Sequence, residues 1–402
     1  MDDRFPISAA VGAVVYSSAC RPEVLLAGFA KEVAARGFRI GGLVPDTSST
    51  GGKAGMTVRE ADSGRRLDLS QRLGPGSRSC SLDLGTLAEV SGALRRGIAA
   101  GVDVLFANKF SAQEAGGGGL AAEMLAAMAE GVPLLTAVKA EHVDHWLRFT
   151  GGRGQVLAPT SEALWRWWGP ERLYDDLILG VGDGAVRRVV VGPQWVMVQG
   201  PDATGLAYRP ERAEGSADAF QQGGTLRDLA QLLRSWDPLA AAVGAAACNA
   251  HYNRPDLAAD PVSGFDVLDC APAALVVVGG FPEIGRRLPG AKVVDHHPLP
   301  GQFPAEAAQW LVPGAEGVLV TASALVNRSL PGLLRLAAAD SQVVVVGPSA
   351  PLTPRLFDYG VASLSGLVVT DPDGLAQAVT GPANGRDLKR FGRLATLKRP
   401  VS

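Results

Sequence analysis

Short apolar runs alternate with helix-like patterns along the first section of the chain. Val11–Ser18 and Phe38–Pro45 have the length and composition of buried strands, and Pro22–Arg36 between them has the spacing of an amphipathic helix. Val102–Asn108 and Val132–Val138 are two more strand-like runs. Strand, helix, strand order of this kind predicts a mostly parallel sheet.

A second section begins after Gly169-Pro170, a dipeptide typical of a boundary. Val186–Val191 and Trp195–Gln199 predict a hairpin, and a third short strand is expected at Gly205–Tyr208. Two helices follow. The second opens at Asp237-Pro238, where aspartate suits the N-cap and proline the first turn. This section is therefore predicted to be a small α+β domain.

The third section contains five apolar runs, each followed by a polar or Gly/Pro-rich loop. The runs are Leu275–Val278, Lys292–Val294, Gly317–Val320, Val343–Val346 and Leu367–Thr370. Most of these loops lead into a helical pattern, which predicts a doubly wound parallel sheet. The sequence thus predicts an α/β protein of three domains, covering residues 1–165, 171–262 and 263–402.

The composition fits folded domains in a reducing compartment. Of the 402 residues, 47 % are hydrophobic and 19 % are charged, which is enough apolar material for real cores. The net charge of −2 gives no support for a nucleic-acid or membrane partner, and no apolar run approaches the ~18 residues of a membrane helix. The four cysteines form no C-x-x-C pair and no disulfide-like spacing, which indicates a cytoplasmic protein.

The first section lacks a phosphate-binding loop. Such a loop needs G-x-x-x-x-G-K-[ST] after the first strand, but here the strand runs into Tyr16-Ser-Ser-Ala-Cys-Arg-Pro-Glu23. The sequence therefore argues against ATP as a ligand. The glycines of Glu114–Gly119 open a helix and form either an anion site or a flexible loop. Ser70–Ser77 either lines a cleft or is an ordinary surface turn.

Four stretches of the first section carry a family resemblance. They are Arg39–Val44 (RIGGLV), Leu69–Gly76 (LSQRLGPG), Asn108–Gly116 (NKFSAQEAG) and Trp146–Gly152 (WLRFTGG). Together they resemble an uncharacterised family related to nucleoside-triphosphatases and often encoded near molybdenum transport genes. The resemblance implies an NTPase-like domain without its phosphate loop, and a molybdenum-related enzyme or transporter as a partner.

Polar residues gather after the strands of the third section. In an open parallel sheet, ligands bind beyond the carboxyl ends of the strands. Hydroxyls and free N–H groups at helix starts suit oxyanions, although plain N-capping is their commonest use. No G-x-G-x-x-G follows the first strand, which argues against NAD. The residues expected to hold a small ligand are Gly279, Gly280, Thr321, Ser323, Asn327, Gly347 and Ser349.

Imidazoles at the same edge provide candidate metal ligands. His296 and His297 are adjacent and would point opposite ways in an extended segment, so one of them is expected to face the crevice. Asp295 or Glu283 could complete a site for a transition metal such as zinc, copper, nickel or iron. The alternative is one surface histidine and one histidine packed against the sheet.

Cys248 and His251 form a second candidate metal-binding pair. They are three residues apart near the end of a helix, so they share one helix face and offer a thiolate and an imidazole. The alternative is a buried cysteine and a histidine favoured by the helix dipole. Cys270 precedes the first strand of the third section and is predicted to be a core residue.

A second resemblance covers roughly residues 172–395 and is carried by several motifs in order. The motifs are Trp236-Asp-Pro, Gly244–Ala250 (GAAACNA), Val278-Gly-Gly-Phe-Pro, Leu311-Val-Pro-Gly, Thr321–Leu330 (TASALVNRSL), Gly347–Leu352 (GPSAPL) and Phe357–Gly360 (FDYG). They resemble the putative heavy-metal chelation family. The resemblance implies an enolase-N-terminal-like domain, a Rossmann-like domain and a small ligand or metal in the cleft between them. The chain departs from that family at Asp295-His-His-Pro298, where a glutamate-x-x-proline type segment is expected, so no metal identity carries over.

Three functions are consistent with these residues. The first is a cytoplasmic binding protein for a transition metal or molybdate, acting in metal homeostasis or metallocofactor supply. The second is an enzyme acting on a pterin or nucleotide precursor, with Asp295 or His296 as general base. The third is a scaffold or chaperone for a metalloenzyme. No motif supplies a nucleophile or a triad, so binding is favoured over catalysis, and a homodimer stays open.

Overall fold

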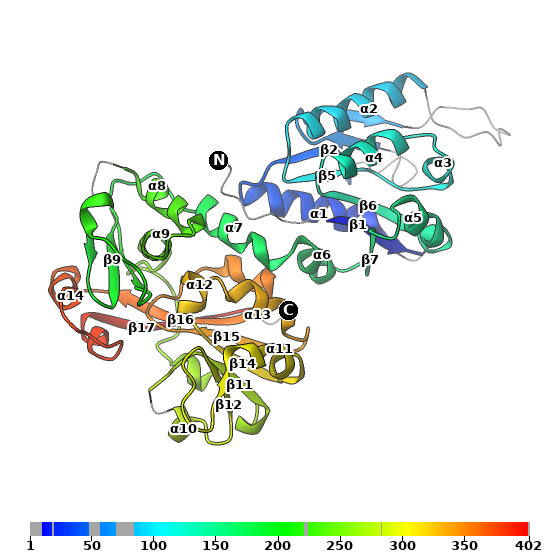
Figure 1. Ribbon diagram of the computed structural model, residues 1–402. Helices are drawn as coiled ribbons and strands as arrows, with labels where there is room; N and C mark the ends of the chain where they lie inside the picture. The colour runs from blue at the N-terminus through cyan, green and yellow to red at the C-terminus, as the bar shows by residue number, and fades with distance from the viewer. Residues whose placement is uncertain are drawn as a thin grey trace. The chain divides into compact units, whose positions relative to one another are not determined.

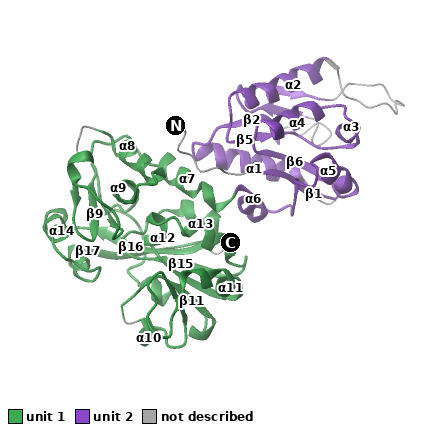
Figure 2. Ribbon diagram, viewed as in Figure 1, with its two compact units in different colours: residues 1–5, 169–402 green, residues 6–168 purple. Residues whose placement is uncertain are grey.

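The computed structural model describes residues 10–17, 20–47, 57–69, 84–220, 224–282 and 284–400. The chain forms two compact units, one of residues 6–168 and one built on residues 169–402 (Figure 2). The predicted turn Ser70–Ser77 and the candidate ligand Glu283 lie outside the described residues. Within the described ranges, no helix is long and apolar enough to span a bilayer.

The unit of residues 6–168 is built on a seven-stranded sheet with the order β4-β3-β2-β5-β6-β1-β7. β2, β5, β6, β1 and β7 are parallel, and β3 and β4 add an antiparallel hairpin at one edge. The mostly parallel arrangement predicted from the sequence is confirmed. The strands are β1 (Val11–Tyr16), β2 (Ile40–Pro45), β3 (Thr57–Glu60), β4 (Arg66–Asp68), β5 (Val104–Phe106), β6 (Leu134–Lys139) and β7 (Gln155–Leu157).

Helices cover both faces of this sheet, and Figure 1 shows α1 and α2 on opposite sides of β2. A close approach of β2 to β5 requires glycine, because a β-carbon at Gly42 would lie 2.2 Å from the carbonyl oxygen of Phe106. Trp146 is fully buried and packs edge-on against Phe110. The helices are α1 (Pro22–Ala35), α2 (Leu84–Ala99), α3 (Ala112–Ala115), α4 (Ala121–Ala129), the 3-10 turn η1 (Ala140–His142), α5 (Val143–Phe149) and α6 (Ser161–Trp168).

The other unit begins with a small antiparallel sheet of order β10-β9-β8, packed against the long helix α9. The side chain of Asp237 accepts a hydrogen bond from the Ala240 N–H at 2.7 Å, which confirms the predicted N-cap. The elements are η2 (Pro170–Arg172), α7 (Leu173–Leu179), β8 (Arg188–Val191), β9 (Trp195–Gln199), β10 (Thr204–Tyr208), η3 (Ala217–Phe220), α8 (Leu226–Gln231), η4 (Leu232–Arg234) and α9 (Pro238–Tyr252).

A second seven-stranded sheet completes this unit, with the order β13-β12-β11-β14-β15-β16-β17. The five strands predicted from apolar runs are present and parallel, although the fifth begins at Val361 and not at Leu367. β17 was not among the predicted strands, and it pairs antiparallel with β16 at the edge of this mostly parallel sheet. The strands are β11 (Leu275–Val278), β12 (Lys292–Asp295), β13 (Phe303–Pro304), β14 (Gly317–Thr321), β15 (Gln342–Val346), β16 (Val361–Val369) and β17 (Gly392–Lys398).

The small sheet and this larger sheet share a hydrophobic core. Trp195 and Leu206 from the small sheet pack in one cluster with Leu367, Leu375 and Val379 from the end of the chain. The segments that the sequence assigns to two domains are therefore packed into a single unit. Its remaining helical segments are η5 (Gly264–Asp266), η6 (Pro272–Ala274), α10 (Ile284–Arg287), η7 (Ala305–Ala307), α11 (Ala308–Leu311), η8 (Val312–Gly314), α12 (Ser323–Val326), α13 (Leu330–Leu336), η9 (Pro354–Tyr359), α14 (Pro372–Val379) and η10 (Asp387–Phe391).

Candidate functional site

The larger sheet of the C-terminal unit has a topological switch between β11 and β14. The chain leaves β11 toward β12 on one side and leaves β14 toward β15 on the other. Ligands of open parallel sheets bind in the crevice at such a point, beyond the carboxyl ends of the strands. The loops that begin there carry Gly279-Gly280 after β11 and Ala322-Ser323 after β14.

Five of the predicted site residues lie next to one another at this switch. A β-carbon at Gly279 would lie 2.3 Å from Cγ2 of Thr321, and one at Gly280 would lie 3.2 Å from Oδ2 of Asp295. The Thr321 and Ser323 hydroxyl oxygens are 3.1 Å apart. The two glycines therefore leave room for the carboxylate and the hydroxyls to approach the same loop.

Gly347 extends this group on the β15 side, since a β-carbon there would lie 3.4 Å from Cβ of Ala322. At the other end, Oδ1 of Asp295 accepts a hydrogen bond from the His297 N–H at 2.8 Å. Asp295 is half-buried, whereas the side chains of His296 and His297 are exposed. One carboxylate oxygen is thus held in place beside two imidazoles that face solvent.

Ser349 and Asn327 make structural hydrogen bonds of their own. The Ser349 hydroxyl accepts a hydrogen bond from the Tyr208 N–H at 2.8 Å, and Ser349 is almost fully buried. The Asn327 side chain accepts from the N–H and the hydroxyl of Ser329, ahead of α13. Ser349 therefore joins the small sheet to the larger one, and Asn327 orders a turn.

Cys248 and His251 have different surroundings although they lie one helical turn apart in α9. Burial raises the pKa of the Cys248 thiol to about 12, so the thiol of the metal-free chain is protonated at neutral pH. Burial also lowers the pKa of His251, and nearby arginines lower it further. The His251 ring accepts a hydrogen bond from the Gly182 N–H at 3.5 Å and packs edge-on against Tyr252.

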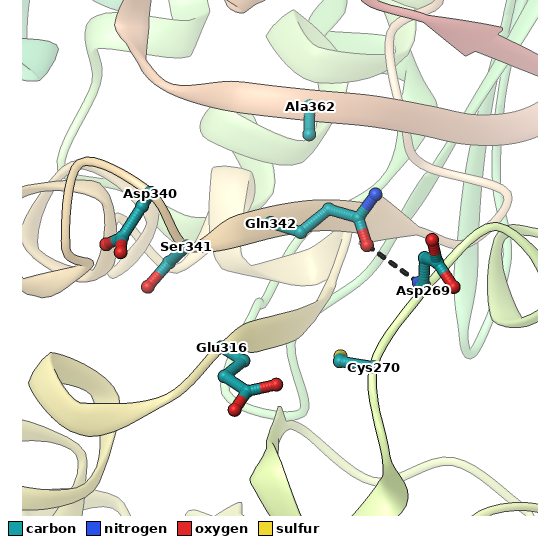
Figure 3. Close-up of a pocket in the computed structure, with 7 residues that line it drawn as sticks. All are labelled: Asp269, Cys270, Glu316, Asp340, Ser341, Gln342 and Ala362. Atoms are coloured by element: carbon teal, nitrogen blue, oxygen red, sulfur yellow. Dashed lines mark hydrogen bonds between the residues drawn. The ribbon is translucent and has the colours of Figure 1, made fainter.

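Cys270 lines a pocket of about 480 Å³ at the amino ends of the strands, at the opposite end of the sheet from the switch (Figure 3). Its thiol is half-buried, so the prediction that it is a core residue is wrong. Burial raises the pKa of the thiol, and Glu316 and Asp269 raise it further.

A smaller hollow of about 250 Å³ lies between the two sheets of this unit. It is lined by the turn from Gln199 to Thr204 in the small sheet and by Val369 and Thr370 at the end of β16. The resemblance to the chelation family implies a ligand cleft between these two segments. None of the candidate ligand residues predicted from the sequence lines this hollow.

The N-terminal unit places its own carboxylate where a phosphate loop would hold an anion. Glu23 lies in the first turn of α1, directly after β1, and its carboxylate is 2.6 Å from Nζ of Lys109. The Lys109 ammonium also lies over the Tyr16 ring, 5.4 Å from its centroid. The helix N-terminus and a lysine therefore already have an anionic partner in the carboxylate of Glu23.

No three His, Cys, Asp or Glu side chains of the described residues are already grouped around one point where a metal ion would fit. A metal held at the switch would therefore require rotation of the exposed imidazoles. That rotation is sterically open because His296 and His297 lie at the surface.

Three segments of the chain match known protein families. Residues 11–167 match a family described as "Protein of unknown function (DUF2478)". Residues 174–252 and residues 264–398 match two families that are both described as "Putative heavy-metal chelation". The resemblance stated from the motifs of the C-terminal unit is therefore confirmed for these two segments.

Parts of the chain are also similar to individual proteins. The chain is 39% identical over 160 residues, in its N-terminal part, to "Molybdenum import ATP-binding protein ModC 2" of Bradyrhizobium diazoefficiens, and it spans only 18% of that protein's length. A crystal structure of a DUF364-family protein of unknown function from Desulfitobacterium hafniense has a TM-score of 0.52 and 27% identity, covering 57% of this chain and 98% of that one. A DUF364-family structure from Pyrococcus horikoshii has a TM-score of 0.49 and 18% identity, with the same coverage.

Proposed function

We propose that the C-terminal unit binds a heavy-metal cation at Asp295, with imidazole ligands from His296 and His297. The observation that carries the proposal is the Asp295 carboxylate beside the topological switch. One of its oxygens is fixed by the His297 N–H, and the other faces Gly280. Carboxylate and imidazole together suit divalent zinc, nickel, copper or iron. Thr321 and Ser323 offer hydroxyl oxygens on the far side of the same glycine loop.

The charges at the switch favour a cation over an oxyanion. Asp295 would repel molybdate, and the hydroxyls of Thr321 and Ser323 already lie within hydrogen-bonding distance of each other. The helix α12 that starts at Ser323 has only four residues, so its dipole is small. A cation is attracted by the Asp295 carboxylate and needs neither free hydroxyl donors nor a helix dipole.

A binding protein of this kind would sequester a metal or pass it on in the cytoplasm. Two segments match families named for heavy-metal chelation, which supports metal as the ligand. The N-terminal part resembles a protein whose name refers to molybdenum import, which supports a role beside metal uptake or metallocofactor supply. An exposed, incompletely assembled site suits transfer, because its ligand exchange is not blocked by burial.

The direct test is metal titration of the full chain after removal of bound metal. Ni²⁺ and Zn²⁺ binding would be measured by calorimetry for the wild type, for Asp295→Asn and for His296→Ala/His297→Ala. We expect both variants to weaken the C-terminal site at least about tenfold, since the loss of second-shell groups alone costs 10–100-fold. His251→Ala is the matched control and should leave this site unchanged.

Two results would contradict the proposal. One is a C-terminal unit whose Ni²⁺ and Zn²⁺ affinities are the same with and without His296, His297 and the Asp295 carboxylate. The other is molybdate binding that is lost in Thr321→Val but kept in the double histidine variant. The second result would assign the hydroxyl side of the switch to an oxyanion instead.

A further inference from the structure

A pair of histidines in the N-terminal unit lies at the topological switch of that unit's own sheet. β1 and β6 are neighbours in this sheet. The chain runs from β1 to β2, which lies on the β6 side of β1, and from β6 to β7, which lies on the β1 side of β6. Connections that leave neighbouring parallel strands in opposite directions lie on opposite faces, and ligands of open parallel sheets bind beyond the carboxyl ends of two such strands, here β1 and β6. The chain that leaves β6 there carries Glu141, His142 and His145.

The imidazoles of His142 and His145 are in edge-to-face contact. His142 is the N-cap residue of α5 and His145 lies in the first turn, so the two share a helix face. Their ring centroids are 5.8 Å apart, with an interplanar angle of 73°. Two imidazoles bound to one metal at about 2.1 Å would have a similar centroid separation. Because His145 is exposed, its ring is free to rotate so that one nitrogen of each imidazole is directed at the same ion.

The backbone that carries the pair is anchored on its other face. Trp146, adjacent to His145, is fully buried and packs against Phe110 and Phe149. Thr150 closes the helix by donating to the Trp146 carbonyl at 2.9 Å and accepting from the Gly154 N–H at 3.0 Å. The spacing of the two imidazoles is therefore set by a packed helix and not by a loop.

The charged neighbours allow a cation at this place. Oε1 of Glu141 lies 3.7 Å from Nε2 of His142 and 3.6 Å from Nζ of Lys139. Glu141 is exposed and the Lys139 side chain is more than half exposed. The lysine can therefore move into solvent when the Glu141 carboxylate binds a metal. Lys139 competes for Glu141 but does not occupy the imidazoles.

We infer that His142 and His145 form a transition-metal site in the N-terminal unit, separate from the site proposed at Asp295. The two imidazole nitrogens are the protein ligands that define it, with Glu141 within reach and water in the remaining positions. Imidazole nitrogens favour Cu²⁺, Ni²⁺ and Zn²⁺, and the order of affinity should follow Cu²⁺ above Ni²⁺ above Co²⁺ above Mn²⁺.

The test uses the full chain in a His296→Ala/His297→Ala background, so that the C-terminal imidazoles cannot contribute. Cu²⁺ alone is the probe, with binding followed by calorimetry and by the nitrogen hyperfine pattern in electron paramagnetic resonance. We expect one Cu²⁺ bound through two imidazole nitrogens. Adding His142→Ala/His145→Ala should weaken it at least about tenfold and remove the two-nitrogen pattern.

Asp144→Asn is the control, because it lies between the two histidines on an exposed position and leaves both rings in place. Its Cu²⁺ affinity and hyperfine pattern should equal those of the background. Equal Cu²⁺ affinity with and without His142 and His145, or a pattern that shows one nitrogen or none before they are removed, would overturn the inference. Because the background already lacks His296 and His297, neither result bears on the Asp295 site.

Discussion

Asp176 in α7 is a fully buried carboxylate with a partner for each oxygen. The Arg355 guanidinium donates to Oδ1, and the Tyr359 hydroxyl donates to Oδ2 at 2.9 Å. Removing one member of a buried ion pair leaves the other without compensation. We therefore predict that Asp176→Ala lowers the free energy of unfolding of the C-terminal unit by about 3 kcal/mol, measured by urea denaturation.

Two other variants provide comparisons for this change in the free energy of unfolding. Tyr359→Phe removes one hydrogen bond and should cost about 1 kcal/mol. Asp373→Ala removes a carboxylate 2.7 Å from Arg188, but that carboxylate is 86% exposed, so the free energy should change by less than about 1 kcal/mol. An Asp176→Ala variant no less stable than Asp373→Ala would show that the buried pair contributes nothing.

The buried thiol of Cys248 gives a prediction about reactivity and pH. Its pKa of about 12 keeps it protonated at pH 8, whereas Cys20 is exposed. Iodoacetamide at pH 8 should therefore alkylate Cys20 and spare Cys248 in the folded chain, as read by peptide mass spectrometry. In denaturant both should react, and equal labelling rates without denaturant would contradict the buried assignment.

The raised pKa of Cys248 also determines how the free energy of unfolding changes with pH. In the unfolded chain the Cys248 thiol loses its proton near pH 8.5, but the folded chain retains it up to about pH 12. Between these values the unfolded state binds fewer protons, so the free energy of unfolding falls as pH rises. Below about pH 8 both states are protonated and Cys248 makes no contribution to the pH dependence.

At the scale of elements, α9 and β10 pack in backbone contact. A β-carbon at Gly205 would lie 2.0 Å from the carbonyl oxygen of Ala246 and 2.2 Å from the amide nitrogen of Ala250. We predict that Gly205→Ala pushes the helix off the strand and costs about 2–3 kcal/mol in thermal or urea unfolding. Gly332→Ala in α13 is the control and should gain about 0.5–1 kcal/mol, because nothing lies within 4 Å of that β-carbon. A Gly205→Ala variant as stable as the Gly332→Ala control would refute the close contact.

The elements that local pattern determines were predictable from the sequence. The apolar runs of β11, β12, β14 and β15 are continuous because both faces of a parallel strand are buried. α9 begins where Asp237 and Pro238 place it. β17 was missed because its residues, GRLATLK, mix apolar and charged side chains, and only its pairing with β16 makes it a strand.

The roles of individual site residues depend on contacts between distant segments, and the sequence does not show these. Ser349 has the pattern of a ligand-binding hydroxyl, yet it accepts from the N–H of Tyr208, 141 residues earlier. The adjacency of Asp295, Gly280, Gly279 and Thr321 follows from strand order, so the rule on carboxyl ends was sufficient to predict it. The His142-x-x-His145 spacing was present in the sequence, but only the ring geometry distinguishes it from two surface histidines.

At the scale of the whole molecule, the sequence divides the chain into three sections and the structure into two units. The difference arises from the core that Trp195, Met197 and Leu206 share with Leu367 and Val379. The indole N–H of Trp195 also donates to the carbonyl of Ala383 at 2.8 Å. Separating the small sheet from the larger one would expose this apolar surface on both pieces.

We therefore predict that a fragment of residues 169–402 folds alone, whereas fragments of residues 171–262 and 263–402 do not when expressed apart. Burial of each large apolar side chain contributes about 1.5–3 kcal/mol to stability. The free energy lost with the shared cluster is therefore larger than the free energy of unfolding of a typical domain. Cooperative urea unfolding and dispersed amide resonances are the measurements. A fragment of residues 6–168 should also unfold cooperatively, because its own cluster, which includes Leu134 and Trp146, is complete without the rest of the chain. A cooperative transition in the isolated 263–402 fragment, at the same midpoint as in 169–402, would mean that the three sections and not the two units are the folding units of this chain.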